Sequence, residues 1–106
     1  MFYEIRRYQS RPGRRAEWIR YMEDLVIPFQ TAAGMTVTAS FADEEDADGY
    51  VWIRRFDDEV QREALYAAVY ETDRWKNEIG PVVHGLLIPE QSVVTRVTPT
   101  PASPLQ

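Results

Sequence analysis

The 106-residue sequence predicts one α+β domain in which strands and helices follow one another in the order β-α-β-β-α-β. Three observations indicate this class. Four short stretches are rich in β-forming residues or alternate between apolar and polar positions, as strands do. Helical periodicity separates the first stretch from the second and the third from the fourth. The length is that of a single domain.

The first strand is predicted over residues 2–9, and Arg11-Pro12-Gly13 ends it. A helix is predicted over residues 14–33. Pro28 should kink or end it near Ile27, because proline lacks the N–H that a helix interior needs. The apolar stripe of this helix consists of Trp18, Tyr21, Met22, Leu25, Val26 and Phe29.

The middle of the sequence predicts an antiparallel hairpin. Residues 35–41 alternate, which should place Met35, Val37, Ala39 and Phe41 on one buried face. An acidic turn over 43–49 follows, and residues 50–56 form the next strand.

The second helical region begins at a cap formed by Asp57 or Asp58 and runs to about residue 72. A short helix with Trp75 and Ile79 follows, and Gly80-Pro81 should interrupt it. The last strand covers residues 93–98. We therefore assign residues 1–98 to the domain and residues 99–106 to a proline-rich tail.

This order of elements is the ferredoxin-like arrangement, a four-stranded antiparallel sheet with helices on one face. The strand over 50–56 carries large side chains on both of its faces, including Trp52 and Ile53. A second sheet should therefore cover the open face, most simply from a symmetry mate, which predicts a homodimer.

Composition excludes several classes of function. The net charge of −5 argues against a nucleic-acid binder. Polar residues interrupt the uncharged run over 25–42, so no membrane span is expected. The start of the sequence has no apolar leader, which favours a cytoplasmic location. No glycine-rich phosphate-binding motif is present, so we expect no nucleotide cofactor.

No metal site is expected either, because the sequence has one histidine and no cysteine. The acidic turn over 43–49 fails as a calcium loop, since Arg55 stands where such a loop needs a bidentate glutamate.

One face of the first strand supplies the first candidate site. Glu4, Arg6 and Tyr8 alternate along it. As a catalytic group they would orient a carbonyl or enolate, with Arg6 and Tyr8 donating to the oxyanion. As a structural group they would form a buried ion pair with a hydrogen-bonded phenol. Arg54 joins the group if its strand lies alongside.

His84 is the only histidine, and it is either a general base in a pocket or an ordinary residue at a helix end. The aromatic residues also have two possible roles. They would line a cavity for an aromatic ligand, or they would fill the core. The candidate ligand-binding residues are Trp18, Tyr21, Trp52 and Trp75, with Tyr66 beside them.

Three segments in order resemble the NIPSNAP-domain family. They are Glu4-Ile5-Arg6-Arg7-Tyr8 with Pro12-Gly13, then the strand over 50–56, then Gln61-Arg62-Glu63-Ala64 with Asp73-Arg74-Trp75. The resemblance covers about residues 2–98, and it departs from the family at Ala39, where glycine is common.

The resemblance implies a dimeric α+β barrel with two ferredoxin-like sheets face to face. The wider superfamily includes cofactor-independent enzymes that act on small aromatic or polyketide-like molecules. Two functions therefore compete. One is a cofactor-independent enzyme that works by proton transfer, cyclisation or oxygenation. In it, His84 or Glu4 would be the base, and Arg6, Arg54 and Tyr8 would be the oxyanion donors. The other is a non-catalytic small-molecule binding or assembly protein.

Overall fold

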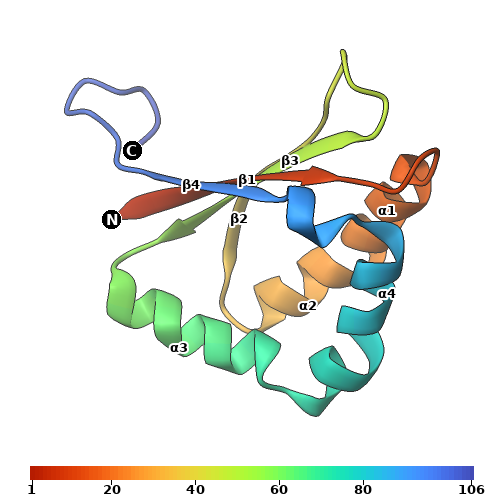
Figure 1. Cartoon of the computed structure of the whole chain (residues 1–106). Helices are drawn as coiled ribbons and strands as arrows, with labels where there is room; N and C mark the ends of the chain where they lie inside the picture. Colours follow the sequence, from red (N-terminus) through yellow and green to blue (C-terminus); the bar gives the residue numbers. More distant parts are fainter.

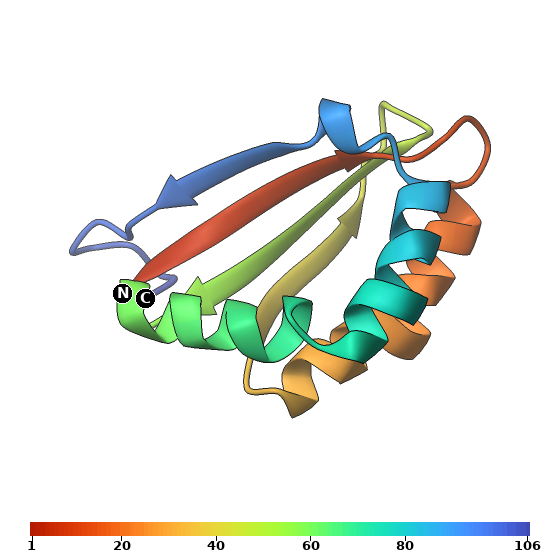
Figure 2. The ribbon, with the colours of Figure 1, turned by 60° about the horizontal axis from the view of Figure 1, so that its bottom comes forward.

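The computed structural model describes all residues from Met1 to Gln106 and confirms the ferredoxin-like α+β class. One antiparallel sheet has the strand order β2-β3-β1-β4. The helices cover one face of it, and the other face is open (Figures 1 and 2). The strands are β1 (Phe2–Gln9), β2 (Thr36–Ala42), β3 (Gly49–Phe56) and β4 (Val93–Val97).

The first helical region is continuous past Pro28. It consists of α1 (Arg15–Tyr21), the π-helical turn η1 (Met22–Val26) and α2 (Ile27–Ala32). Of the two predicted outcomes, a kink or an end near Ile27, the end is therefore wrong. Pro28 lies in the first turn of α2, directly after the π-helical turn, where a missing N–H does little harm.

The second helical region also contains a π-helical turn followed by a helix with proline in its first turn. Helix α3 (Glu59–Tyr70) begins at Asp58, whose carboxylate accepts a 2.7 Å hydrogen bond from the Gln61 N–H. The π-helical turn η2 (Trp75–Ile79) then leads into α4 (Gly80–Leu86), and the 3₁₀ turn η3 (Pro89–Gln91) precedes β4. Gly80-Pro81 does not interrupt the helix, because it too lies in the first turn after a π-helical turn.

Strand β2 does not alternate regularly between its two faces, although the sequence predicts that it does. A bulge between Val37 and Ala39 shifts its register against β3. The extra residue turns the following side chains to the opposite face. Val37 packs against the core, whereas Phe41 lies opposite Val51 on the open face and is 53% exposed. The four apolar residues of this segment therefore do not share one buried face.

The core lies between the sheet and the helices. Its larger cluster includes Trp18, Met22, Val26 and Trp52, and a smaller cluster lies around Phe56 and Val69. The C-terminal segment folds back so that the Tyr3 hydroxyl donates a 2.8 Å hydrogen bond to the carbonyl oxygen of Gln106. None of the helices combines the length and the apolarity needed to cross a bilayer.

Candidate functional site

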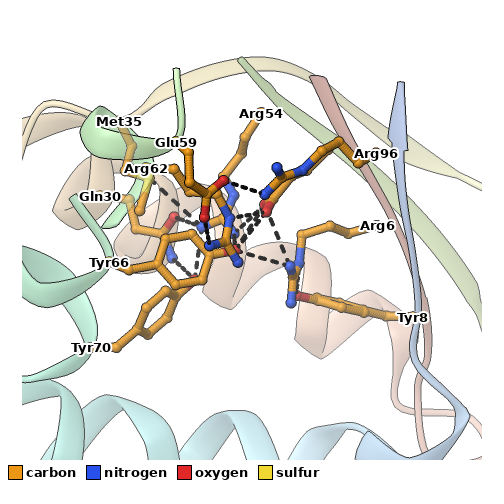
Figure 3. Close-up of polar contacts among 11 residues, drawn as sticks. Arg6, Tyr8, Gln30, Met35, Arg54, Glu59, Arg62, Tyr66, Tyr70 and Arg96 are labelled. Atoms are coloured by element: carbon orange, nitrogen blue, oxygen red, sulfur yellow. Dashed lines mark hydrogen bonds and ion pairs between the residues drawn. The ribbon is translucent and has the colours of Figure 1, made fainter. Parts of the chain in front are cut away.

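A polar network lies on the helix-covered face of the sheet, at the centre of β1 and β3. The β1–β3 register pairs Glu4 with Arg54, so the strands do lie side by side as the candidate group requires. The Nη2 atom of Arg54 donates to Glu4 Oε1 at 2.9 Å, and both side chains are buried. Side chains of α3 complete the network from the other side (Figure 3).

Arg54 has a protein partner at each terminal nitrogen. Nη2 also donates to the Tyr66 hydroxyl at 2.7 Å. Nη1 donates to the Tyr70 hydroxyl at 2.7 Å and to Gln30 Oε1 at 2.9 Å. Its Cζ atom lies 4.7 Å from the ring centroid of Trp52, within cation–π distance. Arg54 therefore holds strand β3 to both helical regions.

Glu4 is held ionised by its neighbours. Its Oε2 accepts a 2.8 Å hydrogen bond from Arg62 Nε, and the Tyr66 hydroxyl lies 2.8 Å from Oε1 and 2.9 Å from Oε2. Burial acts to raise the pKa of Glu4, but the hydrogen bond from Arg62 and the charge of Arg54 outweigh it and lower that pKa. A carboxylate engaged in this way is a weak base, so its geometry favours a positioning role.

Arg6 connects the network to a cavity. Its Nε donates to the Tyr8 hydroxyl at 2.8 Å, and its Nη1 lies 3.2 Å from the Tyr66 hydroxyl and 3.5 Å from Glu4 Oε1. Burial opposes the charge of Arg6, but the phenol oxygens of Tyr8 and Tyr66 outweigh it and raise the pKa of Arg6. Arg6 is therefore a permanent cation at the cavity wall.

The cavity has a volume of about 260 Å³ and lies between the sheet and the helices. We call it the sheet–helix cavity. Most of its lining is apolar and aromatic, as is usual for small-molecule sites. It is lined by Arg6, Tyr8, Trp18, Met22, Val26, Gln30, Trp52, Tyr66, Tyr70, Trp75, Val83 and His84.

Six of the predicted site residues line this cavity, and three do not. Glu4 and Arg54 lie behind the lining, in the polar network. Tyr21 lies elsewhere, in a surface hollow that it shares with Glu17 and Val82. The predicted residues that line the cavity are Arg6, Tyr8, His84, Trp18, Trp52 and Trp75.

His84 reaches the cavity from the last turn of α4 and remains exposed to solvent. Of the two bases predicted from the sequence, it is the one that lines the cavity. No group of three or more histidine and carboxylate side chains converges as metal ligands would.

Three side chains of the network are missing from the residues that the sequence predicts. They are Gln30, Arg62 and Tyr70, which bind Glu4 or Arg54. Arg62, Tyr66 and Tyr70 follow one another at intervals of four residues and so share one helix face. That spacing is a signal in the sequence of a polar stripe facing the sheet. Gln30 gives no comparable signal, because a single amide at the end of a helix is common on surfaces.

Comparisons with known proteins agree with this architecture. The NIPSNAP family model matches residues 3–104. A NIPSNAP family protein of unknown function from Agrobacterium tumefaciens has 26% sequence identity and a TM-score of 0.88, with 100% of this chain and 94% of that chain covered. An uncharacterised NIPSNAP domain protein from Burkholderia xenovorans has 18% identity and a TM-score of 0.85, with 98% and 99% covered.

A more distant structural relative is an antibiotic biosynthesis monooxygenase, with 18% identity and a TM-score of 0.68 over 95% of this chain and 100% of that chain. At this identity the similarity concerns the fold alone. No curated protein matches the sequence.

Proposed function

The chain belongs to the NIPSNAP family, and on this premise we propose that it binds a small aromatic molecule in the sheet–helix cavity and acts on it by proton transfer without a cofactor. The observation that carries the proposal is the cavity itself. Trp18 and Trp52 belong to the core cluster, and both also line this cavity of about 260 Å³, which leaves room for a small molecule beside their rings.

The polar groups of the cavity suit proton transfer. His84 supplies an imidazole, the side chain that most often serves as a general base. Arg6 and Tyr8 supply donors to an oxyanion that develops when a proton leaves the carbon beside a carbonyl. Glu4 and Arg54 hold Arg6 and Tyr8 in position from the side away from the cavity lining. They do so through the hydrogen bonds that join β1, β3 and α3. A base and an oxyanion site facing one cavity are the minimum for enolisation.

Native mass spectrometry of the protein as purified from its host tests the binding step. We expect a retained small molecule in the wild-type protein and its loss in Val83→Phe, because Val83 is a half-buried cavity residue and phenylalanine would occupy the space. Val60→Phe is the control, since Val60 is 76% exposed on α3. Equal retention in Val83→Phe would place the ligand outside the cavity.

Hydrogen exchange in D₂O tests the chemistry. The probes are phenylacetone and phenylpyruvate, whose benzylic C–H signals disappear from the NMR spectrum on enolisation. A positioned general base accelerates such steps by about 10²–10⁴-fold. We expect His84→Ala to lose the acceleration and Glu90→Gln, exposed and outside the cavity, to keep it. Equal exchange rates in the wild type and His84→Ala would contradict the role of His84.

We also propose that two chains pair through the open faces of their sheets. Apolar side chains remain exposed there, among them Phe41, Val93 and Val97 at 53%, 56% and 36%. A sheet face of this kind usually packs against another sheet. Ile53→Glu should lower the mass measured by light scattering from that of a dimer to that of a monomer, and Val60→Glu should not. A wild-type monomer would refute the pairing.

A further inference from the structure

We propose that the ligand of the sheet–helix cavity is a monocyclic aromatic carboxylate, bound through Arg6 and the hydroxyls of Tyr8 and Tyr70. This inference rests on the proposed function, because it names the class of molecule that the same cavity would take. It assigns Tyr70 to the site and gives the ligand a negative charge before any reaction begins.

The first support is an unpaired guanidinium nitrogen. Arg6 uses Nε for the Tyr8 hydroxyl and Nη1 for Tyr66 and Glu4, whereas Nη2 makes no hydrogen bond. Its side chain is 19% exposed, and it lines the cavity. Nη2 therefore has two N–H groups for a ligand, and guanidinium groups bind carboxylates strongly.

The second support is a pair of phenols with hydrogens still to donate. The Tyr8 hydroxyl accepts from Arg6 Nε. The Tyr70 hydroxyl accepts from Arg54 Nη1 at 2.7 Å and from Gln30 Nε2 at 3.2 Å. Neither hydroxyl has an acceptor for its own hydrogen. Tyr66 differs, because its hydroxyl donates to Glu4.

The free polar groups around the cavity are almost all donors. Besides Arg6, Tyr8 and Tyr70, the indole N–H groups of Trp18 and Trp52 have no partner, and both rings line the cavity. A ligand rich in acceptors matches this set, and a carboxylate is an acceptor with two oxygens.

The third support is the charge balance of the network. Four arginines contact only two carboxylates in it. Arg6, Arg54 and Arg62 lie within ion-pair distance of Glu4, while Arg62 and Arg96 pair with Glu59. Two positive charges are left over, although the whole chain carries a net charge of −5. Arg96 and Glu59 are nearly half exposed, whereas Arg6 and Arg54 are largely buried, and an anion beside Arg6 would offset part of their positive charge (Figure 3).

Cavity size sets the number of rings. An apolar cavity of about 150 Å³ is known to take benzene. The sheet–helix cavity, at about 260 Å³, has room for one ring with its substituents. Trp18, Trp52 and Trp75 supply flat apolar walls for that ring.

Titration of the full-length protein with benzoate and benzamide tests the inference, with intrinsic tryptophan fluorescence as the signal. The two probes share one ring and one shape, but only benzoate is ionised at neutral pH. All three tryptophans line the cavity, so binding should change their emission. We expect benzoate to bind at least ten-fold more tightly than benzamide.

Variants assign the preference to the named groups. Arg6→Met should weaken benzoate binding at least ten-fold and change benzamide binding less than two-fold. Tyr70→Phe, which removes a single hydroxyl, should weaken benzoate binding several-fold. Arg7→Met is the matched control, because Arg7 is the next residue of β1, is exposed on the opposite face and pairs with Asp43. Should Arg6→Met fail to fold, Tyr70→Phe and the comparison of the two probes still decide the outcome.

The possible results separate this inference from the function on which it rests. Benzamide binding as tightly as benzoate would overturn the carboxylate and leave an aromatic site in place. Benzoate binding that survives both Arg6→Met and Tyr70→Phe would overturn the assigned residues. No binding of either probe, at concentrations up to the millimolar range, would overturn both the inference and the proposed aromatic site.

Discussion

Replacement of Arg54 by methionine should remove about 4 kcal/mol from the free energy of unfolding. The Arg54 side chain is 0% exposed. It donates four hydrogen bonds to oxygen atoms, on Glu4, Gln30, Tyr66 and Tyr70. A net contribution of about 1 kcal/mol per bond gives about 4 kcal/mol. Loss of one member of a buried ion pair costs about 3–5 kcal/mol, which agrees.

Urea unfolding at a fixed protein concentration, followed by far-UV circular dichroism, measures this loss. A domain of this size loses about 4–8 °C of melting temperature per kcal/mol, so a second measurement by heating should show a fall of roughly 15–30 °C. Arg55→Met is the matched control. Arg55 is the next residue of β3 and pairs only with the exposed Asp57, so its loss should cost less than about 1 kcal/mol.

The double variant Glu4→Leu/Arg54→Met separates the pair from its parts. Both single variants break the same Glu4–Arg54 pair, so the second replacement has less left to remove. The double variant should therefore lose less stability than the two single variants together. The reasoning is refuted if Arg54→Met costs no more than Arg55→Met, or if the double variant loses as much as the two single variants together.

Four further outcomes follow from single groups. The pKa of Glu4 in the folded protein is lowered below 4.5, so the ionised Glu4 side chain stabilises the fold above that pH. The stabilisation should disappear as the pH falls through the pKa of Glu4 in the folded protein. Urea midpoints recorded from neutral to acid pH measure the loss. Burial raises the pKa of Tyr66 to about 12, so its neutral phenol stabilises the fold up to about pH 10. This stabilisation should be lost as the pH rises towards 12. Tyrosinate absorbance and urea midpoints, recorded on the same samples, measure the ionisation and the loss of stability. Asp58→Ala removes the cap of α3 and should cost about 1 kcal/mol in urea unfolding, with Asp57→Ala as the comparison. Gly34→Ala should cost about 1–2 kcal/mol, because Gly34 has φ = 110° and a Cβ there would lie 3.0 Å from Leu65; an unchanged midpoint would contradict this.

Local patterns are sufficient for the fold class. Alternation and helical periodicity concern neighbouring residues, and the four strands and two helical regions lie where these patterns indicate. The errors arise where one residue changes the geometry of its neighbours. Pro28 and Pro81 each follow a π-helical turn, and an extra residue in β2 reverses the faces of Ala39 and Phe41. The conformational propensities of the individual residues predict neither the π-helical turns nor the bulge in β2.

The candidate site is half predictable from the sequence. Strand alternation alone places Glu4, Arg6 and Tyr8 on one face. The partners of this face, Arg62 and Tyr70 above all, come from α3, which lies more than fifty residues further along the chain. Their spacing indicates a shared helix face, but not which strand that face meets.

The sequence by itself determined the order of the elements, the family and the polar face of β1, because each depends on residues close together in the chain. Only the tertiary structure decided that Glu4 and Arg54 lie behind the cavity while Arg6 and Tyr8 line it. The physical reason is that burial and charge pairing depend on every side chain packed around a group. A carboxylate that the sequence offers as a base is held in its ionised form once three arginines and a phenol surround it.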